Sequence, residues 1–174
     1  MKYSLTMRIL HWLMAIMILG LIAVGWYMQG IPDEDPNKYN LYPWHKSFGV
    51  TLLVLVIIRF FVRLFSDVPA PPKALAGWEK TLSKITHVVL YLLMLLVPLS
   101  GLMMSDYAGF GVAWFGIELP EFLADNEQRA VTLHSIHSII PYVLLGLVIL
   151  HLAGAIKHRF FDKNSETDVL KRML

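Results

Sequence analysis

The stretch H-S-I-I-P-Y-V-L-L-G-L-V-I-L-H, residues 137–151, decides the fold class of this chain. It lies inside a longer apolar run, residues 131–156, and a helix needs about 20 mostly apolar residues to cross a bilayer. Both of its ends are histidines. On an α-helix their spacing gives a rise of about 21 Å and a rotation only about 40° short of four whole turns, so His137 and His151 share one face at two depths.

The composition of the whole chain indicates a membrane protein. Apolar residues make up 56% of its 174 residues and charged residues 16%, against roughly 45–50% and 25% in soluble domains. The absence of cysteine excludes disulfides, thiolate metal sites, iron–sulfur clusters and a covalently attached c-type haem. A net charge of +2 is too small to indicate a nucleic-acid partner.

We expect four membrane-spanning helices, at about residues 9–28, 44–65, 85–104 and 131–156. The first run is longer than the apolar region of a signal peptide, and no A-x-A cleavage site follows it, so we expect it to stay in the chain. The predicted fold is an all-α integral membrane four-helix bundle, a single domain over residues 1–174 in the lipid bilayer. Residues 157–174 are predicted to form a cytoplasmic tail with a short surface helix.

Lysine and arginine concentrate on one side of these spans. If both termini are cytoplasmic, twelve of the 15 basic residues lie on the cytoplasmic side, and only Lys38, Lys46 and Arg129 lie outside. This asymmetry predicts both termini in the cytoplasm. Acidic residues show the opposite distribution, because eight of the 13 lie outside: Asp33, Glu34, Asp35, Asp106, Glu118, Glu121, Asp125 and Glu127.

Histidine is rare within a membrane span and normally faces the interior of the bundle, where it has a partner. His11 begins the first span at the cytoplasmic level, and His45 begins the second span at the outer level. His151 therefore has a partner at its own depth in His11, and His137 has one in His45. The sequence predicts two bis-imidazole sites stacked across the membrane.

Two imidazoles that face each other from different helices are the axial ligands that a low-spin b-type haem requires. We therefore expect two haems b, one held by His11 and His151 and the other by His45 and His137. With both axial positions filled, such haems carry electrons and do not bind small ligands. Glycines would make room for the macrocycles, although close helix packing explains them equally well; the candidates are Gly20, Gly25, Gly49, Gly101 and Gly146.

Other uses of intramembrane histidine explain less of this pattern. A zinc or copper transporter usually adds carboxylates or thiolates to its site, and neither Asp nor Glu falls within the four expected spans. A proton channel needs no second site at a matched depth. A purely structural bundle needs neither pair, and ionisable residues inside a membrane are functional by default.

Six motifs make the chain similar to the bacterial cytochrome b561 family, the small four-helix di-haem proteins of the inner membrane. They are YSLTMRILHW at residues 3–12, WHKSFGV at 44–50, IRFFVRL at 58–64, THVVLY at 86–91, H-S-x12-H at 137–151 and KHRFFDK at 157–163. The resemblance covers nearly the whole chain. It implies that His11 and His151 ligate the cytoplasmic haem and that His45 and His137 ligate the periplasmic one, in agreement with the pairing from depth.

Six further residues are candidates for the two ends of the electron path. Arg59 lies 14 residues after His45, so we expect it to contact a haem propionate or a quinone at the inner level; snorkelling to a lipid phosphate is the alternative. His87 is a candidate for hydrogen bonding and proton delivery to a quinone carbonyl, and His158 is a candidate for the same inner site. The outer-face candidates are Lys46, Arg129 and His134.

The resemblance implies electron transfer between a periplasmic redox partner and a membrane quinone, such as ubiquinone, in the bacterial inner membrane. One family member oxidises superoxide outside and reduces ubiquinone inside, so this chain is a candidate superoxide:ubiquinone oxidoreductase. The acidic outer face fits a basic protein, such as a soluble cytochrome, at least as well as a small anion. A further alternative is a membrane-anchor subunit of a larger dehydrogenase or hydrogenase.

Overall fold

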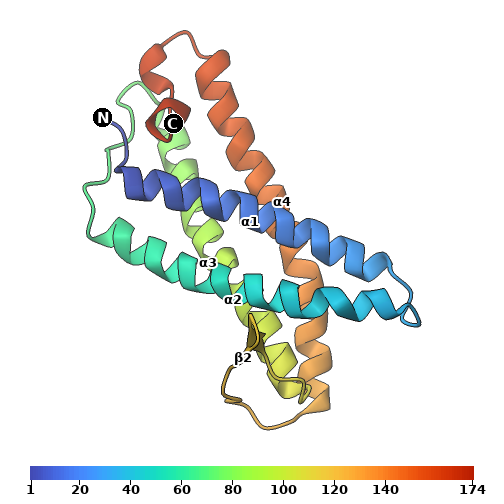
Figure 1. Ribbon diagram of the computed structural model, residues 1–174. Coiled ribbons are helices and arrows are strands. Elements are labelled where there is room, and N and C mark those ends of the chain that lie inside the picture. Colours follow the sequence, from blue (N-terminus) through green and yellow to red (C-terminus); the bar gives the residue numbers. More distant parts are fainter.

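The computed structural model describes residues 1–174, most of which lie in four long helices (Figure 1). These are α1 (Leu5–Gly30), α2 (Pro36–Leu64), α3 (Gly77–Tyr107) and α4 (Glu127–Phe160). Each contains nearly all of one predicted span, and each is long and apolar enough to cross a membrane. The prediction of an all-α protein with four membrane helices is confirmed.

Polar residues begin three of these helices outside the apolar runs. The side chains of Ser4, Asp35 and Asn126 each accept a hydrogen bond from a backbone N–H in the first turn of α1, α2 and α4. Pro36 follows Asp35 at the first helical position of α2, where its missing N–H costs nothing. The helices are therefore longer than the apolar runs, because each of these three begins at its polar capping residue and not at the first apolar residue of the run.

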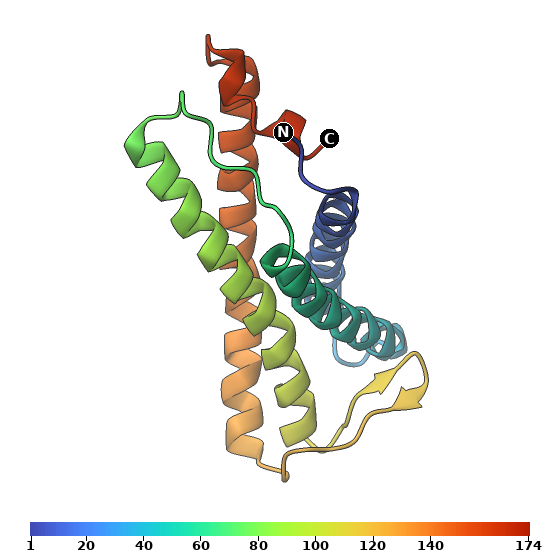
Figure 2. The ribbon, with the colours of Figure 1, turned by 90° about the vertical axis from the view of Figure 1, so that its left-hand side faces the viewer.

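The helices form two pairs that cross each other. α1 and α2 run side by side, and α3 and α4 make up the second pair, which lies behind the first in Figure 1 and beside it in Figure 2. All four helices contribute side chains to one core: Met14, Ile18, Ile22, Leu52, Val56, Leu90, Leu93 and Leu144.

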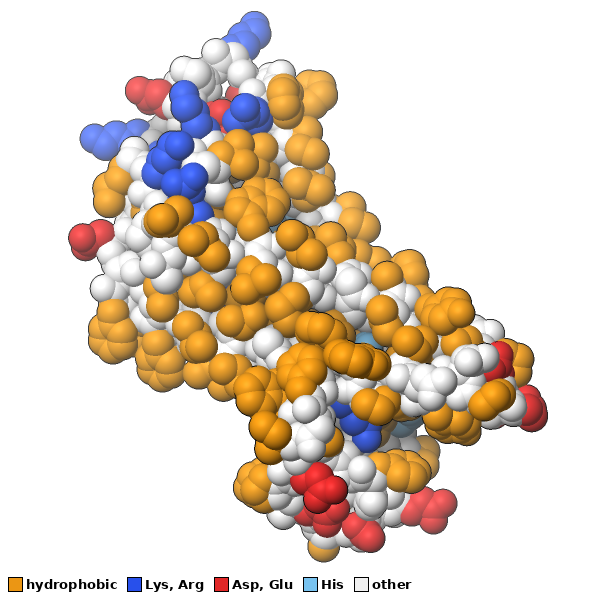
Figure 3. All heavy atoms as spheres, in the orientation of Figure 1, with side chains coloured by type: hydrophobic (Ala, Val, Ile, Leu, Met, Phe, Trp, Pro, Cys, Tyr) orange, Lys and Arg blue, Asp and Glu red, His pale blue; other side chains and the backbone are white.

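Most apolar side chains remain outside this core. Only 22 of 174 residues are buried, and Figure 3 shows hydrophobic side chains across the middle of the molecule, with charged ones near its ends. An apolar surface of this extent marks contact with a membrane.

A small hairpin covers α2 toward the end of the molecule that lies away from both termini; this end is called outer below, after the sequence prediction, and the opposite end inner. Its antiparallel strands are β1 (Ala113–Trp114) and β2 (Ile117–Glu118), and Figure 2 shows it projecting beside the end of the α1–α2 pair. Ser47 of α2 is only 3% exposed, and its hydroxyl accepts a hydrogen bond from the Phe115 N–H at 2.9 Å. The Trp114 indole N–H donates to the hydroxyl of Thr51 at 3.0 Å.

The tail differs from the expected surface helix. It forms two short 3-10 turns, η1 (Ser165–Thr167) and η2 (Leu170–Arg172). The side chains of Asn164 and Asp168 accept backbone N–H groups at the start of these turns, which interrupts a regular helix. The tail folds back on α1, where the Trp12 indole N–H donates to the carbonyl of Met173 at 2.9 Å.

Candidate functional site

The outer imidazole pair joins α2 to α4. The ring centroids of His45 and His137 lie 6.3 Å apart, with their planes at 86°. Both side chains are partly buried. The structure therefore brings together the two histidines that the sequence placed at the outer level.

The backbone of α3 orients the ring of His137. Its Nδ1 lies 2.9 Å from the carbonyl oxygen of Val97, and because a carbonyl only accepts, Nδ1 carries the proton and donates it. The Ser100 hydroxyl donates to the same carbonyl at 2.8 Å and lies 3.1 Å from Nδ1. This tautomer leaves the lone pair of Nε2 free to bind a metal.

Gly101 gives this ring its space. A Cβ atom at Gly101 would lie 2.8 Å from Cε1 of His137, a separation that real Cβ atoms essentially never show. Close approach of α3 to the imidazole thus requires glycine at this position.

Gly25 approaches the other outer ring less closely, since a Cβ atom there would lie an ordinary 3.6 Å from Cε1 of His45. Nδ1 of His45 is buried and has no hydrogen-bond partner. A buried ring nitrogen without a hydrogen-bond partner lowers the stability of the fold unless another group binds to it.

Three imidazoles gather at the inner level. The ring centroids of His11 on α1 and His151 on α4 lie 6.2 Å apart, with their planes at 69°. His87 of α3 lies 5.5 Å from His151, centroid to centroid. The spacing of residues along α3 does not give its rotation, so the sequence did not indicate that His87 is a neighbour of His151.

Arg59 lies at the same level and is only 8% exposed. Its Nη1 donates a hydrogen bond to the carbonyl of Met7 at 2.8 Å. Met7 precedes His11 by one turn of α1, so the guanidinium reaches across from α2 to the helix that carries His11.

Both imidazole pairs have the spacing of two axial ligands on one iron. An imidazole nitrogen binds a metal at about 2.0–2.1 Å and lies about 1 Å from its ring centre, so two rings on opposite sides of one ion have centroids about 6 Å apart. The observed separations are 6.2 Å and 6.3 Å. At Gly20, Gly49 and Gly146 a Cβ atom would meet nothing within 4 Å. These residues fit a haem at each level.

The remaining inner candidate, His158, faces the tail. Its Nδ1 donates to the carboxylate of Asp162 at 2.8 Å, and this hydrogen bond holds the pKa of Asp162 below its usual 3.8. The hydroxyl of Thr167, which is buried, donates to the His158 carbonyl at 3.4 Å. His158 thus helps to fasten the tail to the end of α4.

The three outer-face candidates lie apart from one another. Lys46 donates to the carbonyl of Gly111 in the hairpin segment at 3.0 Å. Arg129 donates to the Tyr107 hydroxyl at 3.0 Å, and its guanidinium lies over that ring. His134 is exposed one turn before His137 on α4. Neither cation is left without a polar partner.

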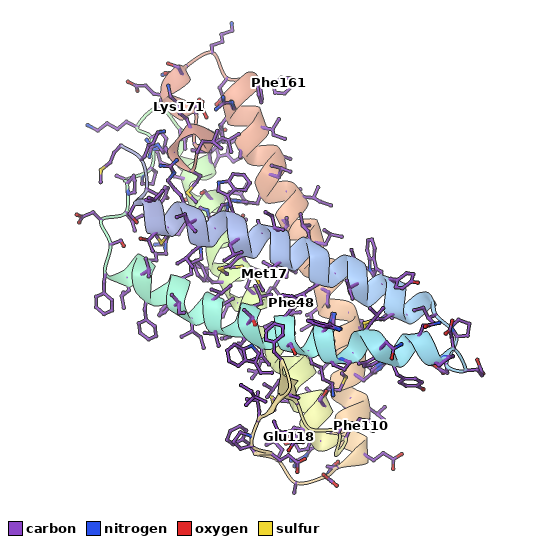
Figure 4. All side chains as sticks on the ribbon, in the orientation of Figure 1. Met17, Phe48, Phe110, Glu118, Phe161 and Lys171 are labelled. Carbon is purple, nitrogen blue, oxygen red and sulfur yellow. The ribbon has the colours of Figure 1, made fainter.

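The outer end is acidic on its surface. Asp106 is buried and accepts the backbone N–H groups of Phe122 and Leu123, and Asp35 caps α2. The other six outer acids are exposed: Asp33, Glu34, Glu118, Glu121, Asp125 and Glu127. Acidic side chains gather at this end of the molecule in Figure 3, and Figure 4 shows Glu118 and Phe110 in the segment around the hairpin.

Val97, Ser100 and Ser47 are the residues that sequence reasoning missed. The signal for the first two is that Pro98 and Ser100 interrupt the third apolar run. Ser47 carried no comparable signal, since its partner Phe115 lies 68 residues further along the chain.

Four apolar helices with facing imidazoles at two levels define a haem-binding membrane protein. The profile of the family described as prokaryotic cytochrome b561 matches residues 2–174. The chain therefore belongs to the prokaryotic cytochrome b561 family, and it is a membrane electron carrier with haem b as its cofactor.

Individual relatives are similar over almost the full chain. A protein named cytochrome b561 homolog 2, from Escherichia coli (strain K12), is 30% identical over 99% of this chain and 91% of its own length. Cytochrome b561 homolog 1 of the same organism is 25% identical over 94% of this chain and 93% of its own length. A protein named probable superoxide oxidase CybB, from Yersinia pestis, is 27% identical over 94% of this chain and 92% of its own length.

Proposed function

We propose that this chain carries electrons across the membrane through two bis-histidine haems b and exchanges them with a membrane quinone at its inner end. Two pairs of facing imidazole rings support this proposal. The ring centroids of His11 and His151 are 6.2 Å apart, and those of His45 and His137 are 6.3 Å apart. Both pairs use α4, on which the two histidines are about 21 Å apart along the axis.

A haem held by His11 and His151, or by His45 and His137, would supply a one-electron Fe(III)/Fe(II) couple. The protein's part is to hold and tune it. The hydrogen bond from His137 Nδ1 to the Val97 carbonyl fixes the ring orientation and raises the basicity of Nε2. Arg59 places a positive charge at the inner level, where it would pair with a propionate or polarise a quinone carbonyl.

We place the end that carries both termini in the cytoplasm. Twelve of the 15 basic residues belong to that end or to its flanks. Reduction of a quinone to a quinol there takes up two protons. We propose that His87 donates a hydrogen bond to the quinone carbonyl and passes on a proton. Its ring centroid lies 5.5 Å from that of His151, which places it beside the inner imidazole pair.

Variants of His87 test the inner site. We expect His87→Gln to keep its haem and to slow haem reduction by decylubiquinol about 100-fold in anaerobic stopped-flow measurements. His158→Gln, which changes a histidine that faces the tail, serves as the control. An unchanged rate in His87→Gln would remove this residue from the quinone reaction. Reduction of the wild-type chain only with an added partner protein would favour the membrane-anchor alternative.

At the outer end we propose a positively charged redox protein as the partner. Six exposed carboxylates attract such a protein and repel an anion. Superoxide is the second candidate, because the 27% identical relative is named a probable superoxide oxidase. The two differ in salt dependence: the rate constant with a basic cytochrome should fall as ionic strength rises, whereas the rate constant with superoxide should rise.

The axial assignment is tested by counting haems in single variants. His11→Ala and His45→Ala should each bind one haem per chain by the pyridine haemochrome assay, while the exposed His134→Ala should keep two. Two haems in either of the first variants would contradict its assignment. Loss of the inner haem only in the double variant His11→Ala with His87→Ala would assign that ligand position to His87 as well.

A further inference from the structure

A pocket of about 410 Å³ opens at the inner end of the molecule, outside the membrane-spanning part of the helices. Its charged lining consists of four cations and two acids: Lys2, Lys73, Lys171, Arg172, Glu166 and Asp168. They come from three segments that are far apart in sequence, namely the N-terminal residues, the α2–α3 linker and the tail. Figure 3 shows Lys and Arg side chains gathered at this end, and Figure 4 places Lys171 there.

Hydrogen bonds hold these three segments together. The N–H of Tyr3 donates to the carbonyl of Arg172 at 3.1 Å, and Nη1 of Arg172 donates to the carbonyl of Ala70 at 2.7 Å. Lys2 donates to the carbonyl of Leu174 at 3.1 Å. The cations therefore line a pocket built by the folded tail and do not sit on a free arm.

The charges of the pocket are only partly balanced within the protein. Asp168 accepts hydrogen bonds from Arg159 at 3.3 Å and from the backbone N–H of Lys171. Lys73 and Lys171 form no ion pair and no side-chain hydrogen bond. Like charges held close together repel, so an anion between them would lower the free energy of this arrangement.

We propose that this pocket binds a phosphate group, that of an anionic phospholipid of the inner leaflet. Three facts support the lipid: the pocket lies just beyond the start of α1 and the end of α4, it opens to the surface, and its cations number four. Clusters of four or more Lys and Arg at the cytoplasmic end of membrane helices bind acidic headgroups. The proposal rests on the cytoplasmic placement of this end, which is part of the proposed function, and it is independent of haem ligation.

Native mass spectrometry of the detergent-purified chain tests the proposal. Dioleoylphosphatidylglycerol is added in micelles, dioleoylphosphatidylcholine is the neutral comparison, and bound lipids are counted. We expect one phosphatidylglycerol to be retained preferentially. The double variant Lys73→Gln with Lys171→Gln should bind it about thirty-fold more weakly, since each cation near a membrane surface contributes about a fivefold change in affinity.

Lys84→Gln with Lys163→Gln is the matched control, because it removes the same charge from exposed positions outside the pocket. It should bind phosphatidylglycerol as the wild type does. Displacement of the lipid by millimolar inorganic phosphate would support the phosphate site and show that it also accepts a soluble anion. Equal retention of both lipids, or equal weakening in the two double variants, would overturn the proposal.

Discussion

The ring of His137 packs against the backbone of α3, which also hydrogen-bonds to it. The Val97 carbonyl accepts its Nδ1–H, and Gly101 leaves the space that its Cε1 occupies. The sequence marks Gly101 as one of five glycines that would make room for a haem, without indicating which histidine it lies beside. That relation depends on the rotation of α3 against α4, which the spacing of residues along one helix does not determine.

Gly101→Ala should disturb the outer site. Its Cβ would lie 2.8 Å from the ring of His137, so the ring must move away from the Val97 carbonyl. We expect partial or complete loss of the outer haem and a destabilisation of about 1–3 kcal/mol from overpacking. Haem counting and thermal unfolding in detergent measure both.

Gly30→Ala is the control for this change, because a Cβ atom there would meet nothing within 4 Å and Gly30 is not among the glycines that would make room for a haem. It should keep both haems. Equal haem loss in the two alanine variants would show that the position of the His137 ring does not depend on the absence of a side chain at Gly101.

Arg59→Gln should weaken the inner level. It removes a charged, buried hydrogen bond to the Met7 carbonyl, and such bonds contribute about 1.5–3 kcal/mol. Loss of a nearby positive charge should also lower the midpoint potential of the inner haem. Redox titration and thermal unfolding check this, with Arg63→Gln, one turn further along α2, as the control. Identical potentials in wild type and Arg59→Gln would place the guanidinium away from the haem.

At the scale of elements, the four membrane helices were predictable because each contains about 20 mostly apolar residues. An apolar run of this length is typical of a helix that crosses a bilayer and longer than a buried helix of a soluble protein needs. The depth pairing of the histidines was predictable as well, since rise per residue is constant in a helix. The hairpin was not, because its strands are two residues long and it is held by Ser47 and Thr51 of α2. The tail turns escaped prediction for a similar reason, as contacts with α1 and with Asn164 and Asp168 shape them.

Ser47→Ala should loosen the hairpin from α2. It leaves the Phe115 N–H without its acceptor in a part-buried position, at a cost of about 1–3 kcal/mol. We expect faster hydrogen exchange at residues 113–118, measured by mass spectrometry. Ser135→Ala, at an exposed serine of α4, should leave the hairpin unchanged. Slow exchange of the hairpin in Ser47→Ala would show that its other contacts retain it, namely the Trp114 hydrogen bond to Thr51 and the packing of Phe115 against Trp44 and Phe48.

For the whole molecule, we expect one contact at the inner end, the hydrogen bond between His158 and Asp162, to respond to acid. The hydrogen bond from His158 is the largest cause that lowers the pKa of Asp162 below 3.8, with Thr167 and Lys157 adding to it. A lowered carboxyl pKa stabilises the folded form fully above the usual value, and the contribution is lost as pH falls through the lowered pKa. The tail should therefore stay docked above about pH 4 and loosen in stronger acid.

Hydrogen exchange of residues 162–174 at pH 5 and pH 3, corrected for the intrinsic rate, measures this loosening. The variant Asp162→Asn should show weaker docking that changes less between the two pH values. A wild-type tail that is equally protected at both would mean that this carboxylate does not hold it.

The proposed function requires that one chain hold two haems b between paired histidines at two levels of the membrane. The most direct measurement is a pyridine haemochrome count on the wild-type chain, purified in detergent from haem-supplied cells, together with its dithionite-reduced minus oxidised spectrum. We expect two haems per polypeptide and a sharp reduced α-band of the b type. One haem per chain, or a colourless protein, would contradict it.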